Sequence, residues 1–131
     1  MAEFVVKRFS DGAWSDESSP GDNPQEMMER AKAAGYRRKS LLAGEGDVHL
    51  TYIEMGPGFT VEPHSHNARE VIHILDGGLT PAGGGDELGA GDSLVIPAGY
   101  VYGFTCGRDG VKFLIFRPSA AGIDHVGAGS S

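Results

Sequence analysis

Hydrophobic and polar residues alternate in short runs along the middle and the later part of the chain, and residues typical of turns end each run. Alternation with a period of two predicts strands that bury one face. The expected strands are Tyr36–Leu42, Val48–Met55, Phe59–His66, Glu70–Leu75, Leu79–Pro81, Ser93–Ile96, Val101–Thr105 and Val111–Arg117. About eight short strands at this spacing favour an all-β sandwich or jelly-roll barrel.

The separators between these runs are rich in glycine, of which the chain has 21. Glycine tolerates positive φ, and Asp forms turns through its own side chain. We therefore expect segments such as Asp76-Gly77-Gly78 and Arg108-Asp109-Gly110 to be turns between separate strands.

Both ends of the chain differ from this pattern. Phe4–Phe9 alternates apolar and basic residues and predicts a short edge strand. Asn23, followed by Pro24 and Glu26, is a helix-start pattern, and Gly35 lies where that helix would end. Residues 1–39 are thus expected to form a strand, a loop and one short helix packed on a barrel of residues 40–117. The Gly- and Ser-rich residues 118–131 predict a flexible tail.

Charge and composition exclude several classes of partner. The formal net charge is −7, which makes nucleic acid and anionic membranes poor partners. No apolar run is long enough to span a membrane, and the first residues lack the pattern of a signal peptide. Cys106 is the only cysteine, so no intramolecular disulfide can form, and a reducing cytoplasm is the expected location.

One cluster of potential metal ligands stands out, His64-Ser65-His66 followed by Glu70. Residues two apart on a strand share a face, so both imidazoles are expected to project together. A bend after His66 would bring the Glu70 carboxylate to the same point. Two histidines and one carboxylate leave coordination positions open, as in non-haem Fe(II) oxygenases and some hydrolytic or isomerising sites. By spacing alone, the three side chains could equally decorate a solvated turn.

The spacing of these residues resembles the first motif of the cupins, the RmlC-like superfamily. The pattern G-x5-H-x-H-x3-E-x6-G is met at every specified position, by Gly58, His64, His66, Glu70 and Gly77. The resemblance implies a double-stranded β-helix barrel in which His64, His66 and Glu70 bind one divalent transition metal per chain. Fe(II) is favoured, and Mn, Zn or Ni would also suit such ligands.

The second cupin motif, G-x5-P-x-G-x2-H-x3-N, is only partly kept. Gly91, Pro97 and Gly99 fit it, but Tyr102 replaces the histidine and Cys106 replaces the asparagine. Tyr102 would then be a ligand, a group that holds a metal-bound water or substrate as acid or base, or a gate. We expect its side chain to enter from the wall opposite the His-x-His strand and to reach beyond the usual ligand position.

These features favour a small metalloenzyme with dioxygenase-type chemistry on a small organic substrate. In that role Tyr102 would be the catalytic residue that moves protons or orients the substrate. The alternatives are a metal-dependent isomerase, lyase or cyclase, and a non-catalytic cupin that binds or senses a metal or small molecule. A homodimer is expected, because the Phe4–Phe9 edge strand would otherwise stay unpaired.

Four further residues are of types that carry chemistry. His73 lies three residues after Glu70, so strand parity places it on the opposite face, in a packing or interface role. His49 begins a strand whose inward face the sequence does not assign, so it lines the pocket or lies exposed. Cys106 is expected to be a small buried thiol rather than a nucleophile, and His125 falls in the predicted tail.

Overall fold

The computed structural model describes residues 4–15, 35–118 and 123–124. Two single turns of 3-10 helix, η1 (Phe9–Asp11) and η2 (Glu45–Asp47), accompany the strands. The strands are β1 (Trp14–Ser15), β2 (Arg37–Ala43), β3 (Val48–Met55), β4 (Thr60–His66), β5 (Glu70–Pro81), β6 (Leu88–Gly89), β7 (Ser93–Ile96), β8 (Tyr102–Pro118) and β9 (Ile123–Asp124). The predicted all-β class is confirmed. The helix expected after Asn23 and the tail residue His125 lie outside the described residues.

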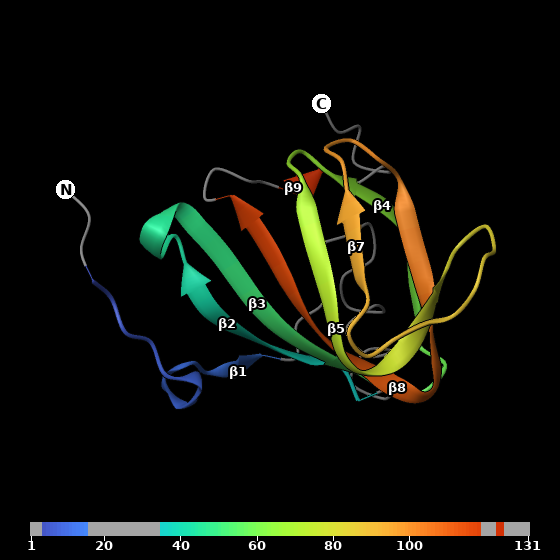
Figure 1. Cartoon of the computed structure of the whole chain (residues 1–131), viewed down its shortest axis with the longest axis horizontal. Coiled ribbons are helices and arrows are strands. Elements are labelled where there is room, and N and C mark those ends of the chain that lie inside the picture. The colour runs from blue at the N-terminus through green and yellow to red at the C-terminus, as the bar shows by residue number, and fades with distance from the viewer. Residues whose placement is uncertain (1–3, 16–34, 119–122, 125–131) are drawn as a thin grey trace.

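The strands pair antiparallel and close around a common interior. One path through the sheet runs β1-β2-β3-β8-β4-β9, and β5 pairs with β6, β7 and β8. Figure 1 shows β5 and β8 curving through the lower end of the molecule, so that each strand contributes to both halves of the barrel. This is the double-stranded β-helix that the sequence predicted.

Two predicted turns are wrong, because they lie inside β5 and β8. The β5–β8 register shifts between Gly77 and Leu79, which marks a β-bulge. Gly77 has φ +75°, and a Cβ atom built there would overlap the carbonyl oxygen of Gly110. The glycines therefore bend two paired strands where their backbones approach closely, and they do not reverse the chain.

Side-chain alternation places the core inside this barrel. On β5, Ile72 and Ile74 are 1% and 0% exposed, and Phe113 on β8 is 1% exposed. On β3 the buried positions are Thr51, Ile53 and Met55. Odd-numbered residues of β3 therefore face inward, which the sequence alone did not decide.

The predicted strand over Phe4–Phe9 is also wrong. Residues 4–8 have no regular secondary structure, and Phe9 opens η1. The Phe9 and Trp14 rings pack edge-on against Tyr52, and the Lys39 ammonium lies 4.0 Å from the centre of the Phe9 ring. Lys39 also donates a hydrogen bond to the Phe9 carbonyl. Aromatic and cation–π packing on the outer face, and not strand pairing, therefore fixes this part of the chain.

Two residues of the predicted C-terminal tail form β9, which pairs with Ser65 and His66 of β4.

Within the described residues, no helix is long and apolar enough to cross a membrane.

Candidate metal centre

A local irregularity in β4 sets the direction of the two histidines. The β4–β8 register shifts between Val61 and His64, and Pro63, which has no backbone N–H to donate, lies inside that shift. After the shift His64 is the direct cross-strand partner of Tyr102. The bulge thus decides which residues of β4 meet the start of β8.

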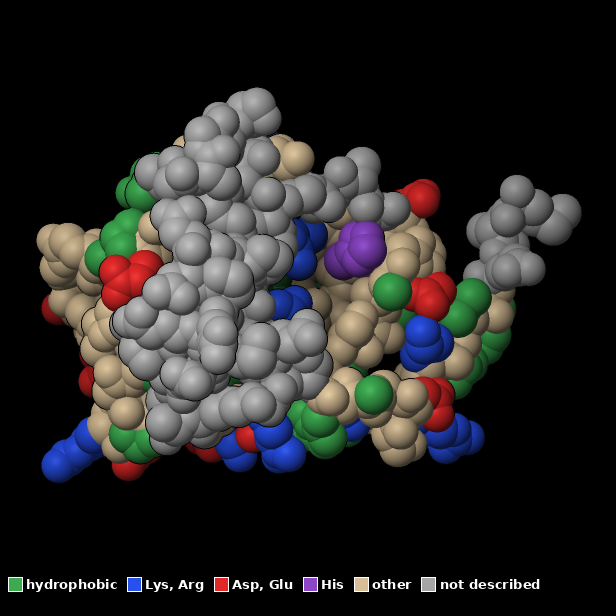
Figure 2. Space-filling model, turned by 180° about the vertical axis from the view of Figure 1, so that it is seen from behind, with side chains coloured by type: hydrophobic (Ala, Val, Ile, Leu, Met, Phe, Trp, Pro, Cys, Tyr) green, Lys and Arg blue, Asp and Glu red, His purple; other side chains and the backbone are tan. Residues whose placement is uncertain are grey.

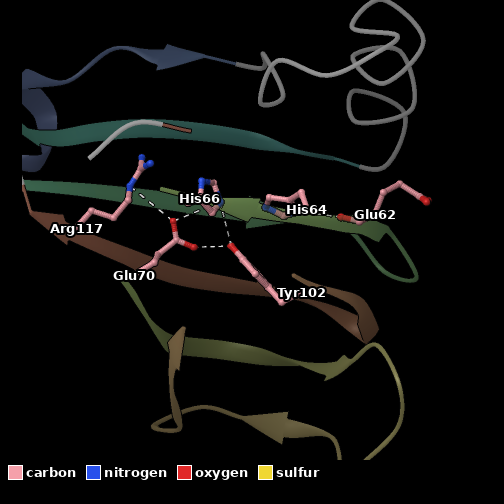
Figure 3. Close-up of polar contacts among 6 residues, drawn as sticks. All are labelled: Glu62, His64, His66, Glu70, Tyr102 and Arg117. Atoms are coloured by element: carbon pink, nitrogen blue, oxygen red, sulfur yellow. Dashed lines mark hydrogen bonds and ion pairs between the residues drawn. The ribbon is translucent and has the colours of Figure 1, made fainter. Parts of the chain in front are cut away.

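The two imidazoles lie together, as the period of two predicts. The ring centres of His64 and His66 are 4.8 Å apart, and the Tyr102 ring lies 4.6 Å from that of His64. The Nδ1 atom of His64 is 2.8 Å from the Glu62 carbonyl oxygen, so Nε2 is the ring nitrogen that would coordinate a metal. Figure 3 shows the Glu62 carboxylate itself turned away from the cluster.

Glu70 is the centre of the cluster. Its side chain is 1% exposed at the start of β5. One carboxylate oxygen accepts a hydrogen bond from the Tyr102 hydroxyl. The other oxygen lies 3.7 Å from Nε2 of His66 and 3.6 Å from Nε of Arg117. Figure 3 shows Glu70 between Arg117 on one side and Tyr102 on the other.

The expected approach of Tyr102 is wrong. Its strand pairs directly with the His-x-His strand, so the side chain does not enter from the opposite wall. The hydroxyl meets Glu70 itself and lies 3.4 Å from Nε2 of His66, so it does not reach beyond the ligand positions. Burial raises the pKa of Tyr102, and the Glu70 carboxylate raises it further. The phenol is therefore a neutral donor in the metal-free protein.

The donor types fit a divalent metal, although the coordination shell is not closed. Among the described residues, no three His, Cys, Asp or Glu side chains converge closely enough to hold an ion as they stand. The 3.7 Å between His66 Nε2 and the Glu70 oxygen is nevertheless shorter than about 4.2 Å, the span of two metal–ligand bonds of about 2.1 Å. His66 and Glu70 would therefore hold the ion, and His64 lies beside them with its ring oriented by a backbone carbonyl.

Arg117 is the residue at this site that the sequence reasoning missed. It follows Phe113 and Ile115 at a period of two, so a basic side chain occupies a core-facing position of β8. The inward position of Arg117 could therefore be inferred from the sequence by this period. His49 is opposite Arg117 in the β3–β8 register and shares the inward parity of Thr51. Figure 2 shows a histidine patch close to Lys or Arg surface on the face that it views.

The remaining candidates lie elsewhere. Nδ1 of His73 is 2.8 Å from the Ser93 hydroxyl on the outer face of the barrel, which confirms the predicted parity. Cys106 is buried, with its thiol 3.8 Å from the Met55 sulfur. Burial raises the pKa of Cys106 to about 12, so this thiol is inert, as expected.

Comparisons with solved structures support the fold of the described residues. The polyketide cyclase RemF from Streptomyces resistomycificus is 23% identical, with a TM-score of 0.68, and the match covers 96% of this chain and 86% of that one. KdgF from Halomonas sp. is 18% identical, with a TM-score of 0.63 and coverages of 88% and 94%. A variant of oxalate decarboxylase from Bacillus subtilis is 17% identical, with a TM-score of 0.60, and the match covers 89% of this chain but 31% of that one.

These identities show the fold and not the reaction. A comparison with curated protein sequences gives no match. The family model described as a cupin domain matches residues 51–116, a range that holds His64, His66, Glu70 and Tyr102. With half of its length inside that match and a double-stranded β-helix around the cluster, the chain belongs to the cupin family.

Proposed function

We propose that the protein binds one divalent transition metal per chain through His64, His66 and Glu70 and uses it in a reaction on a small organic substrate. The burial of Glu70 carries this proposal. A carboxylate that is 1% exposed is costly unless strong partners compensate it. The nearest nitrogens of His66 and Arg117 lie 3.7 and 3.6 Å from its second oxygen, and a metal ion bound there would compensate the carboxylate more strongly than these two contacts do.

Among metals, Fe(II) with dioxygenase-type chemistry is the first candidate. Two imidazoles and one carboxylate leave coordination positions open for substrate and oxygen. A bound Fe(II) would supply oxygen activation at those positions. Tyr102 would orient the substrate or donate a proton to it, because its hydroxyl is neutral and lies among the ligand atoms. Mn, Zn and Ni suit the same ligands.

A redox-neutral reaction, such as that of an isomerase, lyase or cyclase, is the second candidate. The contact between Tyr102 and Glu70 favours it, because a neutral phenol beside a carboxylate is an acid–base pair. Zn would support such a reaction and would not support an oxygenase. A non-catalytic binding cupin remains the third candidate, supported by the loss of the second-motif histidine and asparagine at Tyr102 and Cys106.

The test is metal content. Protein purified without added metal, and again after incubation with Fe(II), Mn, Zn or Ni, is analysed for elements. We expect about one ion per chain in the wild type and a large loss in His66→Ala and Glu70→Gln. His73→Ala is the matched control, because His73 lies on the outer face and should leave metal content unchanged. Wild-type protein that binds no more metal than Glu70→Gln would refute the site.

Open coordination positions have their own test. Nitric oxide added to the Fe(II)-loaded protein should give the electron paramagnetic resonance signal of an iron–nitrosyl centre. Loaded protein without that signal would argue against oxygenase chemistry and leave the redox-neutral candidates.

The homodimer also remains a proposal, on a new basis. An outward-facing apolar row crosses the barrel in cross-strand register, through Leu42, Leu50, Phe116, Val71 and Val95. Val95 is 65% exposed and Phe116 is 46% exposed. Because the row carries no charge, two acidic chains can meet there without opposing like charges. Light scattering should give a dimer mass that Val95→Glu lowers, and a monomeric wild type would refute the proposal.

A further inference from the structure

Arg117 is a cation inside the barrel with an incomplete set of partners. Its side chain is 12% exposed, and its Nε atom lies 3.6 Å from the Glu70 carboxylate. That distance gives an ion pair but exceeds a hydrogen bond. Nε is buried and has no hydrogen-bond partner among the described residues. The Nε end of the guanidinium is therefore compensated only by this long ion pair.

The charge of the site changes once Glu70 binds a metal. Glu70 is the only buried carboxylate among the described residues. Histidines that bind a metal are neutral. A divalent ion and the Arg117 guanidinium then face a single negative charge. The occupied site carries two uncompensated positive charges in a poorly hydrated interior, which strongly favours an anion.

On this basis we propose that Arg117 binds the anionic group of the substrate, and that the substrate is a small organic acid whose carboxylate or other oxyanion lies between Arg117 and the metal. The inference rests on the proposed metal site and adds the substrate class to it. Arginine suits this role because its planar fork can hold two oxygens of one carboxylate at once. Figure 3 shows Arg117 meeting Glu70 through one nitrogen, with the rest of the guanidinium extending beyond it.

The competing explanation is that Arg117 only neutralises Glu70. The two explanations differ once metal is bound, because a neutralising role then ends and an anion-binding role begins. Removing Arg117 would in both cases relieve repulsion of the metal, so metal affinity should stay equal or rise. Only the anion-binding role predicts weaker binding of an added carboxylate.

The experiment uses the full chain loaded with Co(II), whose visible absorption reports changes in coordination. Acetate is the anionic probe, and acetamide is its neutral analogue of nearly the same shape. Wild type should bind acetate about tenfold or more tightly than acetamide. Arg117→Gln should weaken acetate binding ~10-fold or more and leave acetamide binding and cobalt content unchanged. Arg117→Lys, which keeps the charge and loses the fork, should fall between them.

Arg37→Gln is the matched control, because Arg37 stacks on Trp14 and pairs with Glu54 on the outer face. It should bind acetate as the wild type does. Equal acetate affinities in wild type and Arg117→Gln, at equal cobalt content, would overturn the role of Arg117 and leave the metal site standing. A wild type that holds no cobalt would overturn the metal site, and the Arg117 proposal with it. Should Arg117→Gln not fold, equal binding of acetate and acetamide by the wild type is the decisive negative result.

Discussion

Replacing Tyr102 by Phe removes one hydroxyl and keeps the ring that packs 4.6 Å from His64. In the metal-free protein this hydroxyl donates to the buried Glu70 carboxylate. A hydrogen bond to a charged group contributes about 1.5–3 kcal/mol, and its loss leaves a buried acceptor oxygen unsatisfied. We therefore expect the free energy of unfolding of metal-free Tyr102→Phe to fall by about 2 kcal/mol. For a domain of this size the melting temperature should drop by roughly 5–10 °C.

The measurement is thermal and urea unfolding of the metal-free protein, followed by circular dichroism. Tyr100→Phe is the control, since it deletes the same atom from a side chain that is 59% exposed. That change should alter stability by less than about 0.5 kcal/mol. If both variants unfold at the wild-type midpoint, the contact between Tyr102 and Glu70 contributes nothing to stability, and the compensation argued for the buried carboxylate is wrong.

Three further predictions concern the turnover of Tyr102→Phe, the bulge at Gly77 and the buried thiol of Cys106. Tyr102→Phe should keep near wild-type metal content and lose ~10²-fold in turnover if the hydroxyl is a proton donor or substrate anchor, whereas a fall in metal affinity would identify it as a ligand. Gly77→Ala should cost about 3 kcal/mol or more in urea unfolding, because its Cβ would overlap the Gly110 carbonyl oxygen, whereas Gly83→Ala, with φ +92° and nothing within 4 Å, should cost about 1 kcal/mol. Burial raises the pKa of Cys106 from 9.0 to about 12, so its thiol contributes stability below pH 9 that is lost between about pH 9 and pH 12. The free energy of unfolding of Cys106→Ala should therefore decline less steeply than that of the wild type over that pH range.

The alternation of apolar and polar residues was sufficient to predict the bounds of a strand that buries one face and ends at turn residues. The predicted bounds of β3 and β7 agree with the structure, because each is an alternating run between turn residues. The same reasoning failed at Gly77, since a glycine with positive φ serves a hairpin and a bulge equally well. Whether the chain reverses or bends there depends on the backbone of Gly110, which is distant in sequence. Phe4–Phe9 failed for a similar reason, because the Tyr52 ring and the Lys39 ammonium that hold Phe9 come from other strands.

The candidate site likewise has one part that local spacing predicted and another that it did not. The spacing of His64, His66 and Glu70 predicted that their side chains gather, because one strand and the bend after it position all three. The second motif brought Tyr102 to the site, but the direction of its approach required knowing that β8 pairs with both β4 and β5, which the motif spacing does not contain. That pairing brings the hydroxyl onto Glu70.

The charge of the whole chain and the charge inside the barrel favour partners of opposite charge. A net charge of −7 on the sequence disfavours anionic partners at the surface. Inside the barrel, Arg117 stands at an inward position of β8, against the one buried carboxylate among the described residues. Coulomb interactions are stronger there than in water, so the potential inside the barrel depends more on this single cation than on distant, screened surface acids. An acidic protein would thus be able to select an organic acid as substrate, as proposed for Arg117, because the interior that would hold the metal determines the potential at the site.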